Sequence, residues 1–251
     1  MTLNDIALTY DTDKSSKLHH YTKQYERYFA PLREEPLRIL EIGIQNGHSL
    51  KTWKTYFPNA HIYGVDIVDC SGMDEDRVTT LIGSQNDLYF LRKITDTYGP
   101  FDIIIDDGSH YSTDMKISFD FLFPSLKPGG LYVVEDLHCV YWPEFSDGGH
   151  AFMNRLKELT DSVNGHGKWG LADIANSEKD HVYQNKKFGT PDWWDHNVEY
   201  VHLYRSIVFI KKYDSGALYK SKPHHLIRWY AQVWRFVGKV WRTIVRTIKK
   251  S

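Results

Sequence analysis

Two short apolar runs, each followed directly by acidic residues, constrain the fold of this chain more than any other feature. Residues 101–105 lead into the sequence Asp-Asp-Gly-Ser-His at 106–110, and residues 130–134 lead into Glu-Asp at 135–136. Continuous apolar runs of this length are typical of buried parallel strands. In an open parallel sheet, ligands bind just beyond the carboxyl ends of the strands. We therefore expect both acidic groups at one edge of a parallel sheet, where a ligand would bind.

Together, the two acidic groups predict a divalent-metal site with a base beside it. They would bring several carboxylates and a histidine into one small volume, where like charges repel unless a cation or protons intervene. Oxygen ligands favour Mg²⁺, Ca²⁺ or Mn²⁺ over zinc. His110 is the candidate base, because histidine has an ordinary pKa of about 6.5 and accepts a proton at neutral pH. The alternative interpretation is that these residues are ordinary polar strand ends facing solvent.

Strand-like and helix-like segments alternate along most of the chain. Five apolar runs are predicted as strands: residues 37–42, 61–66, 77–82, 101–105 and 130–134. Helix-like segments lie between them at residues 49–57, 88–97 and 112–126. This order predicts an α/β fold with a doubly wound, Rossmann-like, mostly parallel sheet. Two further runs, at 198–204 and 206–212, predict an antiparallel hairpin at one edge, which completes a seven-stranded sheet.

Further segments surround or interrupt the sheet domain, which we expect over residues 37–214. Residues 1–36 are expected to form an N-terminal helical cap, because aromatic residues within 18–29 recur on one face of a helix. An insert, residues 138–197, interrupts the domain. Its stretch 164–197 has no clear periodicity, and a segment of that length is typical of a lid or a binding insert.

The C-terminal segment, residues 222–251, has the pattern of a basic amphipathic helix. Apolar residues recur every three or four positions, Arg and Lys occupy another face, and no acid occurs from residue 215 onwards. Two interpretations stay open. The helix contacts an anionic membrane surface through residues 224–250, which would place the protein peripherally at the inner face of the membrane. Alternatively, it docks on the domain or on a second subunit of a homo-oligomer.

The first strand, turn and helix predict a nucleotide-type cofactor site. Glycines in this turn would let the backbone approach a ligand at a helix N-terminus. The spacing from Glu41 to Gly47 is Glu-x-Gly-x-x-x-Gly, not the dinucleotide fingerprint, which argues against a nicotinamide oxidoreductase. Asp66 either accepts hydrogen bonds from ribose hydroxyls or caps the following turn. The loop 83–87 would border an adenine. The candidate cofactor contacts lie around this turn and the neighbouring strand ends: Glu41, Gly43, Gly47, Asp66, Ser84, Gln85 and Asp106.

Charge and cysteine content argue against other classes of protein. The net charge of −1 shows no basic bias of the kind that nucleic-acid binding requires. The two cysteines, Cys70 and Cys139, form neither a metal-finger spacing nor a disulfide framework, so we expect a cytoplasmic protein. The N-terminus lacks the pattern of a signal peptide, and no apolar run of about 18 residues or more predicts a membrane span.

These motifs resemble those of two nested groups of enzymes. The turn at 40–47, Asp66 and the Leu-Lys-Pro-Gly-Gly turn at 126–130 resemble class I S-adenosylmethionine-dependent methyltransferases. Over about residues 9–212, the chain more closely resembles the metal-dependent sugar O-methyltransferases of macrolide antibiotic pathways (the macrocin and mycinamicin type). The closer resemblance is carried by Thr12, Asp13, Lys14, His19, Tyr21, Tyr25 and Glu26, by the segments 106–110 and 135–138, and by Tyr141 and Trp142.

The resemblance implies a reaction, two cofactors and roles for particular residues. S-Adenosylmethionine would donate a methyl group to a sugar hydroxyl of a glycoside or glycan. If the basic C-terminal segment contacts a membrane, a lipid-linked glycan becomes the expected acceptor. Mg²⁺ would be held by Asp107, Glu135 and Asp136, and His110 would take the acceptor proton. The candidate acceptor contacts are His138, Tyr141, Trp142 and Tyr21.

The sequence leaves the acceptor open. Asp11 stands where the sugar enzymes often have a glycine before Thr-Asp-Lys, and the basic C-terminal segment is not part of the shared pattern. A methyltransferase acting on a catechol or another non-sugar diol is therefore an alternative. A second alternative is a catalytically idle methyltransferase fold that serves as a membrane-associated interaction module.

Overall fold

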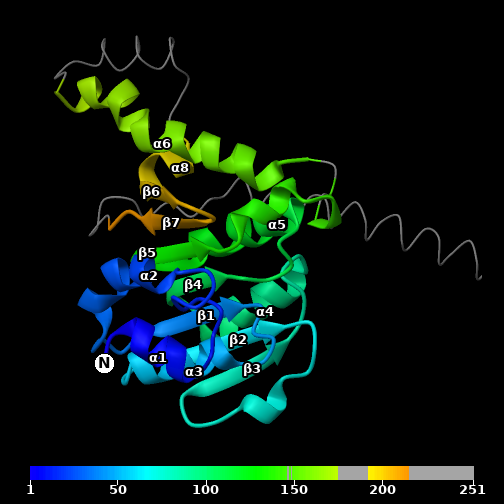
Figure 1. Ribbon diagram of the computed structural model, residues 1–251. Helices are drawn as coiled ribbons and strands as arrows, with labels where there is room; N and C mark the ends of the chain where they lie inside the picture. Colours follow the sequence, from blue (N-terminus) through cyan, green and yellow to red (C-terminus); the bar gives the residue numbers. More distant parts are fainter. Residues whose placement is uncertain (146, 148, 175–191, 215–251) are drawn as a thin grey trace, which may run out of the picture. The chain divides into compact units, whose positions relative to one another are not determined.

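A mixed sheet lies at the centre of the structure, a computed structural model that describes residues 1–145, 147, 149–174 and 192–214 (Figure 1). In this part of the chain the sheet has seven strands in the order β3-β2-β1-β4-β5-β7-β6. The parallel strands are β1 (Arg38–Ile42), β2 (His61–Asp66), β3 (Val78–Ile82), β4 (Phe101–Asp106) and β5 (Leu126–Val134). A hairpin of β6 (Val198–Tyr204) and β7 (Ile207–Lys212) joins β5 antiparallel through β7. The predicted doubly wound sheet with an edge hairpin is confirmed.

Helices lie along both faces of this sheet (Figure 1). The α-helices are α1 (Leu3–Thr9), α2 (Thr22–Phe29), α3 (His48–Tyr56), α4 (Leu88–Tyr98), α5 (Ser112–Leu122), α6 (Ala151–Ile174) and α8 (Trp193–Asn197). Short 3₁₀ turns are η1 (Ala30–Leu32), η2 (Ser71–Met73), η3 (Phe123–Ser125), η4 (Leu137–Tyr141) and η5 (Pro143–Phe145). Helix α2 caps the sheet with α1 and α3, whereas α5, α6 and α8 pack together on the opposite face.

Aromatic residues fill the core on both sides of the sheet. On the α1–α3 side, Tyr25 packs with its ring centroid 5.1 Å from that of Trp53 and 5.3 Å from that of Phe209. On the other side, Phe119 of α5 lies 5.1 Å from Tyr132 and 5.5 Å from Trp194. Because successive side chains of a strand point to opposite faces, β5 and β7 contribute to both halves of the core. This packing places aromatic side chains against both faces of the sheet.

Several predicted boundaries were wrong, and each has a local cause. The first helix of the cap was missed, and the second begins at Thr22 because the residues before it form turns, with the Thr22 N–H donating to the Lys14 carbonyl. Strand β3 begins one residue late, since Arg77 has a φ of 62°. Helix α5 ends at Leu122 because Pro124 follows and has no N–H to continue the helical hydrogen bonds.

The insert contains more helix than the sequence indicated. Helix α6 continues to Ile174, and α8 forms within the stretch predicted to be aperiodic. The α8 start is set by a capping box, in which the Asp192 carboxylate accepts from the Asp195 backbone N–H. Residues 175–191 and the basic segment 222–251 lie outside the described residues. Among the helices that the structure describes, none combines the length and the apolar composition needed to cross a bilayer.

Candidate active site

A cavity of about 660 Å³ opens at the carboxyl ends of β1, β2, β4 and β5. Parallel strands end there, so the side chains that follow each strand face a common space. The cavity is lined by Gly43, Asp66, Ser84, Gln85, Asp107, His110 and Asp136, among others. Most of the residues predicted from the strand ends are thus brought together.

The glycine turn after β1 is shaped by contacts inside the protein. Gly43 has a φ of 83°, and a Cβ there would lie 2.0 Å from the carbonyl oxygen of Asp107. Gly47 precedes α3 with a φ of 70°, and a Cβ there would lie 2.5 Å from Met73 Sδ. Gly43 lines the cavity, whereas Gly47 does not. The turn needs glycine for its conformation and for close packing against the neighbouring strand end.

Asp66 at the end of β2 faces the cavity and also fixes the adjacent turn. Its Oδ2 accepts from the backbone N–H groups of Ile44 and Gln45 at 3.1 and 3.0 Å, and Oδ1 accepts from Val68 at 3.1 Å. Burial alone would raise the pKa of Asp66, but these backbone donors hold it below its ordinary value. The carboxylate is therefore ionised at neutral pH and presents negative charge to the cavity.

Asp106 and Gln85 hold the loop between β4 and α5. The Gln85 amide donates to Asp106 Oδ1 at 3.1 Å and accepts from the Ser109 backbone N–H at 2.6 Å. Asp106 also accepts from Ser118 and Tyr132, and it is 1% exposed and absent from the cavity wall. Burial raises the pKa of Asp106 to about 6. The structure thus places Asp106 behind the cavity, where it orders the loop that carries His110.

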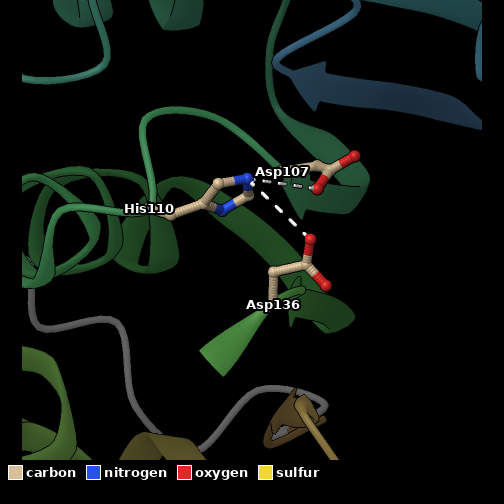
Figure 2. A group of neighbouring side chains, drawn as sticks. All are labelled: Asp107, His110 and Asp136. Carbon is tan, nitrogen blue, oxygen red and sulfur yellow. Dashed lines mark ion pairs between the residues drawn. The ribbon is translucent and has the colours of Figure 1, made fainter. Parts of the chain in front are cut away.

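Asp107, His110 and Asp136 converge on one wall of the cavity (Figure 2). His110 Nε2 lies 4.0 Å from Asp107 Oδ1 and 4.0 Å from Asp136 Oδ2. Each side chain offers one ligand atom, and these atoms all lie within 4.8 Å of one another. Both His110 and Asp136 have a positive φ, 59° and 52°, a conformation that costs energy and is concentrated at functional sites.

Glu135 points away from this group into a buried cluster of charges. Its Oε1 accepts from the Tyr25 hydroxyl at 2.5 Å and lies 3.0 Å from Lys14 Nζ. The same ammonium contacts Asp107 Oδ2 at 2.5 Å and lies 3.7 Å from Glu41 Oε1. Burial raises the pKa of Glu135 well above its ordinary value; the Asp107 charge adds to the rise and the Lys14 charge opposes it.

Glu41 lies in the same buried cluster and does not reach the cavity. Its side chain is fully buried, and Oε2 accepts from the Ser49 hydroxyl at 2.8 Å. Burial raises the pKa of Glu41 to about 7. The acid therefore joins β1 to α3 from inside, and the structure gives it no direct contact with the cavity.

The candidate acceptor contacts do not line this cavity. Tyr21 is 3% exposed, and its hydroxyl donates to Asp136 Oδ1 at 2.6 Å. His138 packs edge-to-face on Trp142, with ring centroids 4.7 Å apart, just after the strand end that carries Asp136. Tyr141 and Trp142 are 64% and 47% exposed. Both rings are accessible to solvent.

Two contacts of the site were missed from the sequence. Lys14 belonged to the Thr-Asp-Lys motif, but its partner Asp107 is 93 residues away, and no local pattern reveals such a pair. Phe145 of η5 has its ring centroid 5.9 Å from that of His110. A lone phenylalanine in a loop belongs to no sequence pattern that would predict this contact.

The fold and the strand-end site define a class: the order of the parallel strands, the glycine turn after β1 and an acid ending β2 are those of a Rossmann-like methyltransferase domain. Comparisons with known proteins refine this. The chain is 38% identical over 217 residues to mycinamicin VI 2''-O-methyltransferase of Micromonospora griseorubida, covering 84% of this chain and 52% of the relative. It is 40% identical over 224 residues to demethylmacrocin O-methyltransferase of Streptomyces fradiae, covering 84% and 53%.

A solved structure agrees with these sequence matches. The MycE methyltransferase from the mycinamycin biosynthetic pathway, in complex with Mg and SAH, matches with a TM-score of 0.72 and 37% identity over 85% of this chain and 54% of that chain. No family model matches the chain. The chain spans about half the length of the curated relatives it matches. It is homologous to the sugar O-methyltransferases of macrolide pathways, which confirms the resemblance seen in its motifs.

Proposed function

We propose that this chain is an S-adenosylmethionine- and Mg²⁺-dependent O-methyltransferase that methylates a sugar hydroxyl of a glycoside. One observation carries the proposal: a single cavity joins Asp66 and the turn after β1 to the group formed by Asp107, His110 and Asp136. A methyl donor and a metal-bound acceptor would therefore meet within one space. The names of relatives support the acceptor class, since one acts on the 3'-oxygen of a rhamnosyl-tetracenomycin and MycE has been solved with Mg, SAH and mycinamycin VI.

The cavity fits an adenosyl cofactor in size and in chemistry. Its volume of about 660 Å³ lies within the range of small-molecule sites. The ionised Asp66 faces it at the end of β2, where a ribose would offer hydroxyl donors. Ser84 and Gln85 border the same space. We assign direct contact with the cofactor to the residues that line the cavity: Gly43, Asp66, Ser84 and Gln85. The predicted contacts that do not line it would support these residues from behind: Glu41, Gly47 and Asp106.

The donor set also fits a hard divalent cation. Asp107 Oδ1 and Asp136 Oδ2 both face His110, and carboxylate oxygens are the ligands that Mg²⁺ prefers. Glu135 is the third predicted ligand, although the structure does not bring it into this group. Bound Mg²⁺ would stabilise the alkoxide form of a coordinated hydroxyl, which is otherwise a poor nucleophile.

Side chains of this chain would accept the proton and position the acceptor. His110 would accept the acceptor proton at Nε2, the nitrogen that faces both aspartates. The ordered loop at 106–110 would fix the distance between base and acceptor, and such positioning contributes much of the rate in a transfer reaction. Tyr141 and Trp142 offer exposed rings against which an acceptor could pack.

The acceptor class can be tested directly. Labelled S-adenosylmethionine is incubated with the full-length protein, Mg²⁺ and either glycosides with a vicinal diol or catechols. We expect label in the glycosides, because two adjacent oxygens would chelate the metal. Label in catechols alone would assign the enzyme to non-sugar diols, and label in neither would remove the proposed activity for these acceptors.

A lipid-linked glycan acceptor and a peripheral membrane contact through residues 224–250 are predictions from the basic C-terminal segment. Co-sedimentation with anionic liposomes tests the membrane contact, comparing the full chain with one that ends at residue 221. Equal sedimentation of the two would exclude a contact made by this segment.

A further inference from the structure

Residues of the N-terminal cap reach the acidic strand ends from outside the sheet domain. Four side chains between residues 14 and 25 lie within 4 Å of a predicted metal ligand: Lys14, His19, Tyr21 and Tyr25. They come from the motif that carried the closer family resemblance, and the proposed mechanism gives them no part. The contact of Lys14 with Asp107 crosses 93 residues of sequence, and that of Tyr21 with Asp136 crosses 115.

Each predicted ligand has one oxygen held by a donor from this segment. Lys14 Nζ contacts Asp107 Oδ2 at 2.5 Å, whereas Asp107 Oδ1 is the atom that faces His110. The Tyr21 hydroxyl donates to Asp136 Oδ1 at 2.6 Å, whereas Asp136 Oδ2 faces His110. Both aspartates thus have an inner oxygen that is tied to the cap and an outer oxygen directed at the shared wall.

The donors are themselves fixed by burial and packing. Lys14 is 2% exposed, and its backbone carbonyl accepts from the Thr22 N–H that begins α2. Tyr21 is 3% exposed and stacks on His19, with ring centroids 5.1 Å apart. Tyr25, which donates to Glu135, is packed against Trp53. Rigid donors hold a carboxylate in one orientation, and loss of such partners typically weakens metal binding.

Charge gives Lys14 a second role. Its ammonium lies between Glu41, Asp107 and Glu135, and two of these acids are almost completely buried. Buried carboxylates without a cation repel one another and turn apart or take up protons. One permanent cation inside the cluster therefore keeps the acids together before any metal arrives.

We propose that Lys14 and Tyr21 are positioning residues of the metal site: they fix the inner oxygens of Asp107 and Asp136 so that the outer oxygens converge on one ion. The inference rests on the proposed function, because it assumes that these aspartates bind Mg²⁺. It makes the N-terminal cap part of the active site.

The test compares two tyrosines of the cap that differ in their partners. Tyr21→Phe removes the hydroxyl that holds Asp136, whereas Tyr28→Phe removes one that contacts His202 and Tyr204 at the sheet edge. Mg²⁺ is titrated calorimetrically into the full-length protein without turnover, and S-adenosylmethionine affinity and Tm are measured in parallel. We expect Mg²⁺ affinity to fall about 10- to 100-fold in Tyr21→Phe and to stay within about 2-fold of wild type in Tyr28→Phe.

Lys14→Met should lose Mg²⁺ affinity by at least as much, about 10-fold or more. Wild-type Mg²⁺ affinity in Tyr21→Phe and Lys14→Met would overturn the inference, as would a parallel loss of Mg²⁺ affinity, cofactor affinity and Tm in Tyr21→Phe. Failure of the proposed function gives a different result: the wild-type protein itself would bind no Mg²⁺. That result would also overturn the inference.

Discussion

Gly43 shows at the scale of one residue how the cavity depends on backbone geometry. Its φ of 83° lies in the left-handed region, and the space for a Cβ is filled by the Asp107 carbonyl. The glycine therefore allows the turn after β1 to pass directly against the loop that carries the acidic group. A side chain there would push the turn after β1 away from the loop that carries Asp107.

Replacing Gly43 with alanine should destabilise the fold by more than about 2 kcal/mol, because a left-handed alanine costs about 1 kcal/mol and the clash adds to it. Gly72→Ala is the matched control, since a Cβ there meets no atom within 4 Å. Urea unfolding measures both free energies. Equal stability of the two variants would show that the turn relaxes at little cost.

His110 is the residue on which the proposed chemistry depends most. His110→Ala should lower turnover by about 10²- to 10⁴-fold, the usual contribution of a general base, while cofactor and Mg²⁺ affinities stay near those of wild type. His202→Ala, at the sheet edge, serves as the control. Turnover that survives in His110→Ala removes the residue as base, and a large loss of Mg²⁺ affinity would make it a metal ligand instead.

Of the three predicted metal ligands, Glu135 has the weakest support from the geometry. Tyr25 and Lys14 already contact its Oε1. If it binds the metal, Glu135→Gln should lose Mg²⁺ affinity by about the same factor as Asp107→Asn and Asp136→Asn. Calorimetric titration of the three variants measures this. A loss much smaller than in both aspartate variants would assign Glu135 to the support of Lys14 alone.

At the scale of elements, a buried lysine holds β7 to the η3 turn and to the first residue of β5. Lys212 Nζ donates to the carbonyls of Pro124 and Leu126 at 2.9 and 2.6 Å, and it lies 5.7 Å from the Trp193 ring centroid. These contacts join the hairpin to the turn before β5. Burial lowers the pKa of Lys212 to about 8.

This lowered pKa gives the hairpin a predictable response to pH. Between about pH 8 and the ordinary lysine pKa of about 10.4, the unfolded chain binds a proton that the folded chain has released, so folding becomes more favourable as the pH rises. The stability of wild type relative to Lys212→Met should therefore increase across this window, by at most about 3 kcal/mol. Urea unfolding at several pH values measures the difference, and a constant or falling difference would contradict it.

At the scale of the whole molecule, local patterns were enough to predict the sheet but not the cluster behind it. The strands and the acids at 106–107 and 135–136 were predictable because buried parallel strands are continuous apolar runs and their carboxyl ends share an edge. The pairing of Lys14 with Asp107 depends on how the cap folds over the sheet, which no local periodicity encodes. Helix α6 extends past residue 163 through a stretch whose sequence shows no clear period.

The measurement that tests the proposed function most directly is a two-stage experiment on the full-length protein. S-Adenosylmethionine is first titrated calorimetrically, and methyl transfer to glycosides is then followed with Mg²⁺ and with a chelator. We expect cofactor binding and glycoside methylation that stops when the metal is removed. No cofactor binding would contradict the proposed enzyme, and methylation that continues in chelator would contradict the proposal that Asp107 and Asp136 bind a metal.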